Sequence, residues 1–297
     1  MSIDVGALEP LESTQAIDIV VITHNKLELT VSCIAALYEN TSVPFHLIVV
    51  DDSTDWTPKY FEWLKTQHEN ITFIHSDTPY REGNQIFNIA MEHGDTPYLV
   101  TVMNSVRVEP DWEGVALKLM TQNPKIGAIG FKCLFPNGLI ESAGIGLIGF
   151  APVDIGKWEA GHRRSCVYEC QAIQWSFALL RKEAIGKLEE NIYNGFKGWD
   201  DIDNCFTLTK RGWQVWYNGL GVGYHTPRAT RGNSNEELET YKANHENSII
   251  FYKRWGLWDK VQANVKAESD IAKRMKGHSW RDVKQVLGGN DVLSRRR

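Results

Sequence analysis

The sequence lacks the features that mark secreted and membrane-spanning proteins. None of its apolar runs approaches the roughly 20 residues that a membrane-spanning helix needs. The first dozen residues have neither a basic region nor an apolar core, so they do not resemble a secretory signal. The five cysteines are odd in number and include no C-x-x-C pair, which suits a reducing compartment better than a disulfide framework. We therefore expect a cytoplasmic protein.

One spacing of histidine and cysteine also occurs in zinc sites. His162, Cys166 and Cys170 recur every four residues, which on a helix would place them on one face. The surrounding residues are rich in β-branched and aromatic side chains and favour a strand, in which the two cysteines would be about 13 Å apart. One zinc ion cannot bridge that distance. We therefore expect two buried structural thiols there.

The charge of the chain is unevenly distributed. Its net charge is −5, yet residues 261–297 carry nine Lys and Arg against four Asp and Glu, which leaves −10 for residues 1–260. Such a basic tail is either a solvated helical segment or a contact for membrane phosphate, a lipid-linked substrate or nucleic acid. The acidic body would repel a nucleic-acid duplex. Peripheral membrane contact through the tail therefore stays open, and a nucleic-acid acceptor is the less favoured partner.

The first half of the chain alternates apolar runs with segments of helical periodicity. Four runs are expected to form strands: residues 16–23, 46–52, 71–75 and 98–103. The first is nearly continuously apolar, as expected of a strand buried on both faces. With helices between the four strands, this order demands a mainly parallel α/β sheet with right-handed crossovers. Ligands of such sheets bind at the carboxyl ends of the strands. That rule places the following residues on one rim: Thr23, Asp51, Asp52 and Asn104.

Several segments resemble, in order, those of the family 2 glycosyltransferases, which are inverting enzymes of the Rossmann-like GT-A fold. The first half contributes VVITHN, VVDDSTD, REGNQIFNIA and VMNSVRVEPDW, and the second half SFALLRKEAIGKL, GWDDIDNCFTLTKRGWQVWYNG and GYH. The likeness spans roughly residues 16–255 and rests on several ordered motifs. A dinucleotide-binding Rossmann domain is disfavoured because no G-x-G-x-x-G follows the first strand.

The resemblance implies a GT-A domain over residues 1–230, with a nucleotide-sugar half at about 16–110 and an acceptor half at about 111–230. Residues 231–297 would form a C-terminal helical extension that carries the basic tail. The implied donor is a nucleotide-diphosphate sugar of the UDP or dTDP type, and the implied acceptor is a glycan or lipid-linked glycan. Two other functions stay open: a catalytically silent relative that binds nucleotide sugar or glycan, and a nucleotidyltransferase, which would need a glycine-rich phosphate loop that THNKLEL does not supply.

Donor binding is assigned to residues of the rim and the loops behind it. Asp51 ends the second strand, where its carboxylate can accept the imide N–H of uracil or thymine. Gly83 permits close backbone approach to the nucleotide, and Arg81 offers a fork of donors to phosphate. The acidic residues after the second strand could alternatively form a turn and cap the next helix. The remaining donor-binding candidates are Thr23, Asn25, Asp52, Asn88, Asn104, Ser105, Arg107, Arg228 and Arg231.

The segment WDDID is the predicted catalytic centre. An inverting transferase needs a carboxylate that takes the proton of the acceptor hydroxyl, and by the family match Asp201 is this base while Asp200 orients the acceptor. Acidic residues at the start of a helix also stabilise its N-terminus without any chemistry. Trp199 is expected to contact the acceptor, and Trp175 is equally suited to acceptor contact and to packing.

The loop NSV after the fourth strand departs from the family pattern. The family places an aspartate there that holds Mg²⁺ or Mn²⁺ on the diphosphate, whereas Val106 supplies no ligand. A metal could still bind through Asn104, His225 and the diphosphate. Alternatively, the charge of the phosphates is compensated by arginines: Arg107, Arg228 and Arg231. The sequence therefore predicts weak or absent metal dependence.

Overall fold

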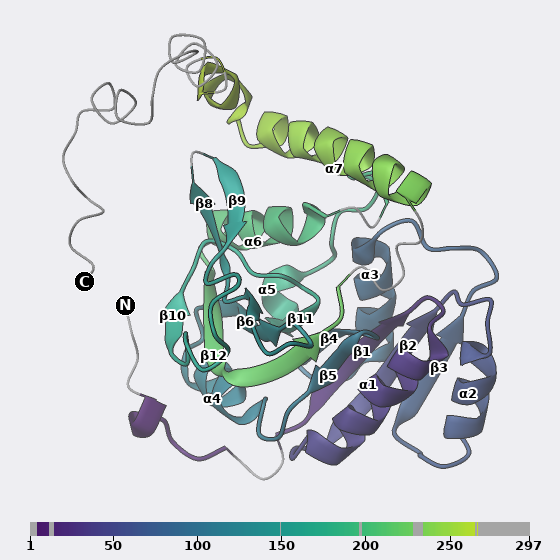
Figure 1. Cartoon of the computed structure of the whole chain (residues 1–297). Coiled ribbons are helices and arrows are strands. Elements are labelled where there is room, and N and C mark those ends of the chain that lie inside the picture. The colour runs from purple at the N-terminus through teal and green to yellow at the C-terminus, as the bar shows by residue number, and fades with distance from the viewer. Residues whose placement is uncertain are drawn as a thin grey trace. The chain divides into compact units, whose positions relative to one another are not determined.

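The computed structural model describes residues 5–11, 15–148, 150–195, 198–227, 234–264 and 266 (Figure 1). The contacts divide the chain into a larger unit, Met1–Phe251, and a smaller unit, Tyr252–Arg297. Helix α7 (Ser234–Arg254) runs across this boundary, so most of its length belongs to the larger unit. Of the helices in the described ranges, none is both long and apolar enough to cross a bilayer. The boundary expected near residue 230 remains a prediction.

The larger unit is built on a ten-stranded sheet with the order β10-β12-β6-β11-β4-β1-β2-β3, with β5 beside β12 and β7 beside β6. A separate hairpin pairs β8 with β9. The strands are β1 (Ile17–Thr23), β2 (Phe45–Asp51), β3 (Ile71–His75), β4 (Tyr98–Met103), β5 (Val106–Val108), β6 (Ile126–Leu134), β7 (Ile140–Ser142), β8 (Ile145–Ile148), β9 (Ala151–Asp154), β10 (Val167–Glu169), β11 (Phe177–Arg181) and β12 (Gln214–His225).

Helices cover the sheet on both faces. The helices of the described residues are η1 (Val5–Ala7), α1 (Leu27–Asn40), α2 (Thr57–Leu64), α3 (Gly83–His93), α4 (Gly114–Gln122), α5 (Lys182–Ile185), α6 (Asp200–Lys210) and α7, and those from α1 to α6 flank the sheet. Ile17, Ile19 and Val21 of β1 form a core cluster with residues of α1, α2 and α4. Helix α3 contacts β1 and β2, whereas α5 and α6 contact β11, β6 and β12. Cover on both faces explains why the strands read as nearly continuous apolar runs.

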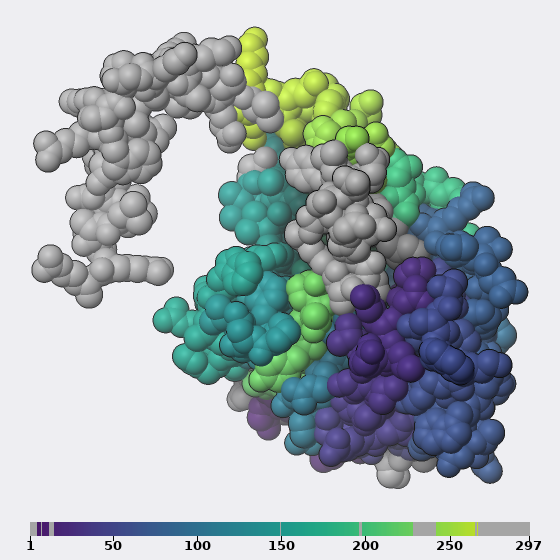
Figure 2. All heavy atoms as spheres, turned by 45° about the vertical axis from the view of Figure 1, so that its right-hand side comes forward, coloured from purple at the N-terminus to yellow at the C-terminus, as the bar shows by residue number. Residues whose placement is uncertain are grey.

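The first half of the fold agrees with the sequence. The four expected strands are present, and β4, β1, β2 and β3 lie side by side and parallel. The helix between β3 and β4, one of those expected between the strands, is α3. In the space-filling view, the purple-to-blue segments of this half lie beside the teal segments of the second half (Figure 2). The mainly parallel sheet between helices is therefore confirmed.

The second half adds strands whose pairing depends on distant residues. β11 is antiparallel to both β4 and β6, while β12 runs parallel to β6. A register shift between Asn218 and Val222 lets the end of β12 also pair with β5, where His225 lies opposite Val106. The loop NSV is thus held against a strand more than a hundred residues away.

The region of the expected thiols differs from the prediction. Cys166 is exposed and Cys170 is only partly buried, because β10 is a short strand at the end of the sheet order. The expectation of two buried thiols is therefore wrong for Cys166. Within the described ranges, no three His, Cys, Asp or Glu side chains are grouped to hold a metal ion.

Candidate functional site

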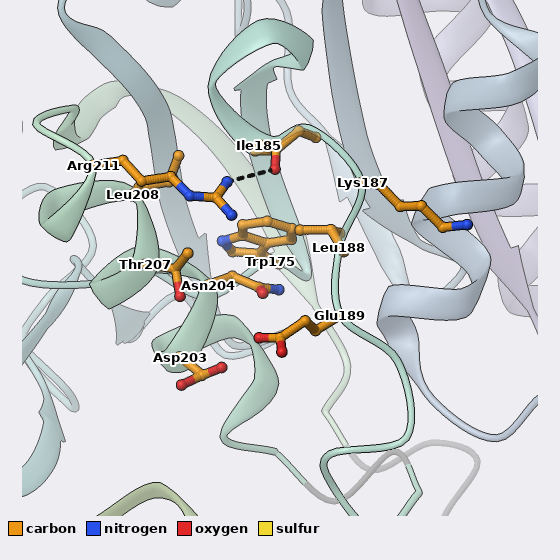
Figure 3. Close-up of a pocket in the computed structure, with 10 residues that line it drawn as sticks. All are labelled: Trp175, Ile185, Lys187, Leu188, Glu189, Asp203, Asn204, Thr207, Leu208 and Arg211. Carbon is orange, nitrogen blue, oxygen red and sulfur yellow. Dashed lines mark hydrogen bonds between the residues drawn. The ribbon is translucent and has the colours of Figure 1, made fainter. Parts of the chain in front are cut away.

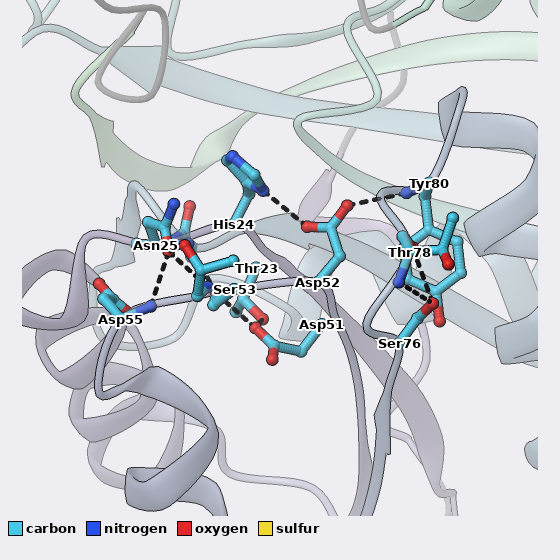
Figure 4. Close-up of polar contacts among 12 residues, drawn as sticks. Thr23, His24, Asn25, Asp51, Asp52, Ser53, Asp55, Ser76, Thr78 and Tyr80 are labelled. Carbon is cyan, nitrogen blue, oxygen red and sulfur yellow. Dashed lines mark hydrogen bonds and ion pairs between the residues drawn. The ribbon is translucent and has the colours of Figure 1, made fainter.

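The carboxyl ends of β1 and β2 are joined by one buried aspartate (Figure 4). Asp51 is fully buried, and its Oδ1 accepts hydrogen bonds of 2.5 Å from the hydroxyls of both Thr23 and Ser53. Its Oδ2 lies 2.6 Å from Nδ1 of His75, at the end of β3. Both carboxylate oxygens therefore have protein partners, and Asp51 holds the ends of three strands together.

The next residue, Asp52, lies closer to the protein surface. One of its oxygens accepts a 2.8 Å hydrogen bond from the backbone N–H of Tyr80. The other is 2.8 Å from Nδ1 of His24, whose side chain is 49% exposed. Desolvation, followed by the charges of Asp52 and Asp51, raises the pKa of the Tyr80 phenol. Asp52 is thus the rim carboxylate next to exposed groups that a ligand can reach.

Asn25 connects the end of β1 to the loop after β2. Its Oδ1 accepts hydrogen bonds from the backbone N–H groups of Thr54, at 2.8 Å, and Asp55, at 3.0 Å. Its own N–H donates to Ser53 Oγ at 2.6 Å. Asn25 and Lys26 both have positive φ, which turns the chain sharply into α1. The side chain of Asn25 therefore shapes the rim.

The first two residues of the loop NSV are engaged within the protein. Asn104 donates from Nδ2 to the backbone oxygen of Asn25 and to Thr30 Oγ1, both at 3.0 Å. The carbonyl oxygen of Ser105 accepts a 3.0 Å hydrogen bond from the N–H of Thr226. These bonds fasten the loop to the turn after β1 and to the segment after β12.

Val106 and Arg107 point to opposite sides of β5, as strand alternation predicts. Val106 is 1% exposed and belongs to the core cluster. Arg107 is 54% exposed, lies over the ring of Tyr224 at 5.1 Å and is 3.5 Å from a carboxylate oxygen of Glu109. Arg107 lines a cleft of about 370 Å³ beside α1 together with Ser105 and Tyr224, and the buried Val106 lies at the wall of the same cleft. The position that the family gives to a metal-binding aspartate is thus a core position here.

Among the described residues around NSV, the candidate ligand His225 is engaged by another side chain. Nδ1 of His225 lies 2.6 Å from Oε2 of Glu141, and this pair is mostly buried. Val106 carries no ligand atom, and the amide nitrogen of Asn104 is already used. Of the described residues here, the hard oxygens that a divalent cation prefers come from Asn104 Oδ1 and the Glu141 carboxylate, and position 106 supplies none.

Gly83 begins α3 directly against the predicted catalytic residues. A β-carbon on Gly83 would lie 2.9 Å from Oδ2 of Asp200, closer than real β-carbons come to a heavy atom. The missing side chain therefore makes room for Asp200, a reason that the sequence did not indicate. Arg81, two residues earlier, is exposed.

Asn88 was expected to contact the donor, but its amide is used elsewhere. Its Oδ1 accepts a 2.9 Å hydrogen bond from the N–H of Leu188, and its Nδ2 donates to the oxygen of Leu188 and to Glu190 Oε1. Asn84 likewise donates to the backbone oxygen of Glu189 and accepts from Nδ2 of Asn204 at 2.7 Å. α3 thus clamps the 188–190 segment and α6, which identifies Asn88 as a residue that joins the two halves.

Asp200 and Asp201 form the first turn of α6. Trp199 precedes them with a φ of 85°, and Oδ1 of Asp201 accepts a 2.8 Å hydrogen bond from the N–H of Ile202. Although both carboxyl groups keep some solvent contact, the surrounding protein desolvates them and raises their pKa values. The charge of Asp200 further raises the pKa of Asp201. A carboxylate with a raised pKa is a stronger base, which suits proton abstraction.

The two tryptophans differ in what they line. Trp199 is 8% exposed, and the centre of its ring lies 5.2 Å from that of Phe251. It lines a cavity of about 230 Å³ that Asp201 also lines. Trp175 is 4% exposed, with its ring 5.3 Å from that of Phe87. It lines a separate cavity of about 20 Å³ (Figure 3), which has room for about one water molecule. Trp175 thus packs within the protein, and its contact with an acceptor stays a prediction.

Three residues at the site carry no recognisable signal in the sequence. Glu141, Asp154 and Gln174 come from short strands and connections without a local motif, and only the folded chain brings them to the site. Arg228 and Arg231, expected to bind the phosphates, lie outside the described residues. Most of the basic tail does so as well.

The chain resembles known proteins both in its fold and in its sequence. The fold is similar to that of GalNAc-T7 solved with UDP, GalNAc and Mn²⁺, with a TM-score of 0.63 at 10% identity, over 91% of this chain and 54% of that one. It is also similar to the mannosyltransferase PcManGT of Pyrobaculum calidifontis solved with GDP-Man and Mn²⁺, with a TM-score of 0.56 at 15% identity, over 95% of this chain and 82% of that one. These neighbours define the class of the fold as the GT-A glycosyltransferase fold.

The sequence comparison identifies the family. The family model described as glycosyl transferase family 2 matches residues 18–188, more than half of the chain. The chain therefore belongs to glycosyl transferase family 2. It is also 25% identical over 270 residues to the uncharacterized protein y4gI of Sinorhizobium fredii, a match that covers 85% of this chain and 29% of that protein. The chain thus spans less than a third of the length of this relative.

Proposed function

We propose that the protein transfers a sugar from a nucleotide-diphosphate donor to an acceptor hydroxyl with inversion of configuration. In this reaction the acceptor oxygen forms a bond to the anomeric carbon as the bond from that carbon to the diphosphate oxygen breaks. The acceptor proton passes to Asp201, and the nucleoside diphosphate leaves with the bonding electron pair. The observation that carries this proposal is the position of Asp201, a carboxylate of raised pKa that lines an open cavity at the start of α6.

The rim at the ends of β1 and β2 is the proposed donor site. Because Asp51 is fully buried, we assign it to hold Thr23, Ser53 and His75 in place. Contact with the nucleotide base, which the sequence assigned to Asp51, falls in this proposal to Asp52, the more exposed neighbour. A carboxylate there accepts the imide N–H of uracil or thymine, which favours a UDP- or dTDP-sugar. Solved neighbours of the fold hold UDP in one case and GDP-Man in the other.

The catalytic assignment is tested by Asp201→Asn, which keeps the size of the side chain but removes the proton acceptor. Turnover should fall by roughly 10²–10⁴, while the affinity for the donor changes little. Glu92→Gln, which alters an exposed carboxylate on α3, is the matched control and should leave turnover unchanged. Normal turnover in Asp201→Asn would move the base elsewhere, with Asp200 the next residue to test.

The donor is identified first by thermal unfolding of the wild type with a panel of UDP-, dTDP- and GDP-sugars. A ligand at 100 times its Kd stabilises the fold by about 2.7 kcal/mol, which is readily measured as a rise in Tm. If no nucleotide sugar raises the Tm, the donor assignment is wrong.

A further inference from the structure

A cavity of about 230 Å³ opens beside Asp201 within the larger unit. Its walls come from the β8–β9 hairpin, the segment before β11, the start of α6 and Asn244 of α7, and Figure 1 shows the hairpin beside α6. The lining combines apolar side chains, such as Ile145 and Ile202, with the polar side chains of Asp154, Gln174 and Asp201. A sugar ring has the same mixture, since its C–H faces are apolar and its edge carries hydroxyls. The volume lies below the roughly 300–1,000 Å³ of pockets for drug-sized ligands, so it suits a single ring.

Asp154, the last residue of β9, is held in a defined orientation at this cavity. Gln174 donates from Nε2 to its Oδ1 at 2.9 Å, and Nζ of Lys157 is 2.8 Å from its Oδ2. The side chain remains 18% exposed. A carboxylate offers about four lone-pair sites, so each oxygen can accept a further hydrogen bond from a ligand hydroxyl. Asp154 and Asp201 thus present two carboxylates to one cavity.

We propose that Asp154 selects the acceptor by accepting a hydrogen bond from a second hydroxyl of a neutral sugar ring, while Asp201 faces the hydroxyl that attacks. This inference rests on the transferase function proposed above. The lining residues within the described ranges include these two carboxylates and no Lys or Arg. Lys157 offsets part of the charge of Asp154, but no Lys or Arg among the described lining residues faces Asp201, so a carboxylate or phosphate on the ring would still be repelled there. The terminal acceptor ring is accordingly neutral, which excludes acidic and phosphorylated sugars as acceptors.

The electrostatics of Asp201 agree with this arrangement. Desolvation raises the pKa of Asp201 most, and the charge of Asp200 raises it next. The charge of Asp154 makes a smaller contribution in the same direction. Removing that charge should lower the pKa of the base even if the fold is unchanged. Asp154 therefore has two separate effects that can be measured, one on acceptor affinity and one on the pH profile.

The test uses the full chain with the nucleotide sugar that gives the largest rise in Tm. The acceptor probes are p-nitrophenyl glucoside, galactoside and mannoside, together with p-nitrophenyl glucuronide, which matches the glucoside apart from a carboxylate. The wild type should transfer to at least one neutral glycoside and discriminate against the glucuronide. Asp154→Asn should raise the acceptor KM by about 10–100-fold, leave the donor KM unchanged and shift the acid limb of kcat/KM to lower pH. It should also lower the ratio of kcat/KM for the glucoside to kcat/KM for the glucuronide.

Two further variants keep the result interpretable. Gln174→Ala releases Asp154 without removing it and should raise the acceptor KM less than Asp154→Asn does. Glu169→Gln, an exposed carboxylate on β10, should change neither parameter. Three results would each overturn the inference. The first is an unchanged acceptor KM in Asp154→Asn, and the second is equal use of glucoside and glucuronide by the wild type. The third is an enzyme that hydrolyses the donor but transfers to no neutral glycoside. Failure of the proposed function is distinct, because then no nucleotide sugar raises the Tm and Asp201→Asn has no effect.

Discussion

Replacing Val106 with aspartate restores the residue type that the family uses at this position, yet it should destabilise the protein instead of creating a metal site. Val106 is 1% exposed and packs in the core cluster with Val108, Trp112 and Phe177. Its Cγ1 lies 3.2 Å from where a β-carbon on Gly223 would be, which shows how little space separates β5 from β12. A carboxylate there would be buried without a cation to pair with among the described residues of this cluster.

The magnitude follows from two losses. Burial of the valine side chain contributes about 1.5–3 kcal/mol, and an uncompensated buried charge costs about 3–5 kcal/mol unless the carboxyl becomes protonated. Together the two losses come to about 4.5–8 kcal/mol for the charged form, which corresponds to a fall in Tm of about 9–32 °C for a domain of this size. Because burial raises the folded-state pKa of the new carboxyl, its protonated form is favoured in the fold. The loss should therefore be smallest near pH 4 and grow as the pH rises through that raised pKa.

The assay is thermal unfolding followed by circular dichroism at pH 5 and pH 8, with and without Mn²⁺. Arg107→Asp is the matched control, because it introduces the same carboxylate one residue away on an exposed side chain whose ion pair with Glu109 is worth at most about 1 kcal/mol. Val106→Ala separates the loss of packing from the introduced charge. The reasoning fails if Val106→Asp unfolds within about 2 °C of Arg107→Asp, or if Mn²⁺ raises its Tm well above that of the wild type.

Four further outcomes are expected. Gly83→Ala should lower turnover by displacing Asp200 while leaving donor affinity nearly unchanged, and equal turnover in the variant would contradict the contact. Asp51→Ala should lower the free energy of unfolding by about 1–3 kcal/mol, because three donors lose their acceptor, and denaturant titration measures this loss. Asp52→Ala should mainly lower the affinity for the nucleotide, which ligand titration measures. The raised pKa of Asp201 should place the acid limb of kcat/KM above the ordinary aspartate value near 4, since only the deprotonated carboxyl acts as a base; a limb at pH 4 would refute this. Activity should survive EDTA, and loss of turnover that Mn²⁺ restores would show that a metal takes part.

The candidate site divides into a part that the sequence predicted and a part that it could not. The rim residues Thr23, Asp51 and Asp52 were placed correctly at the ends of β1 and β2, because a buried parallel strand is read from its own apolar run. The first turn of α6 carries Asp200 and Asp201 as expected. The sequence did not show which of the two rim aspartates is closed off, because that depends on His75 at the end of a third strand.

Secondary structure in the first half and the start of the acidic helix were thus determined by residues within a few positions of one another. Tertiary structure decided the burial of Val106, the clamp from Asn88 to the segment at 188–190, and the placement of Asp154 beside Asp201. Each of these depends on a contact between residues about fifty to more than a hundred positions apart. Local periodicity cannot encode such contacts, because the facing partner is set by which strands and helices pack together across the whole sheet.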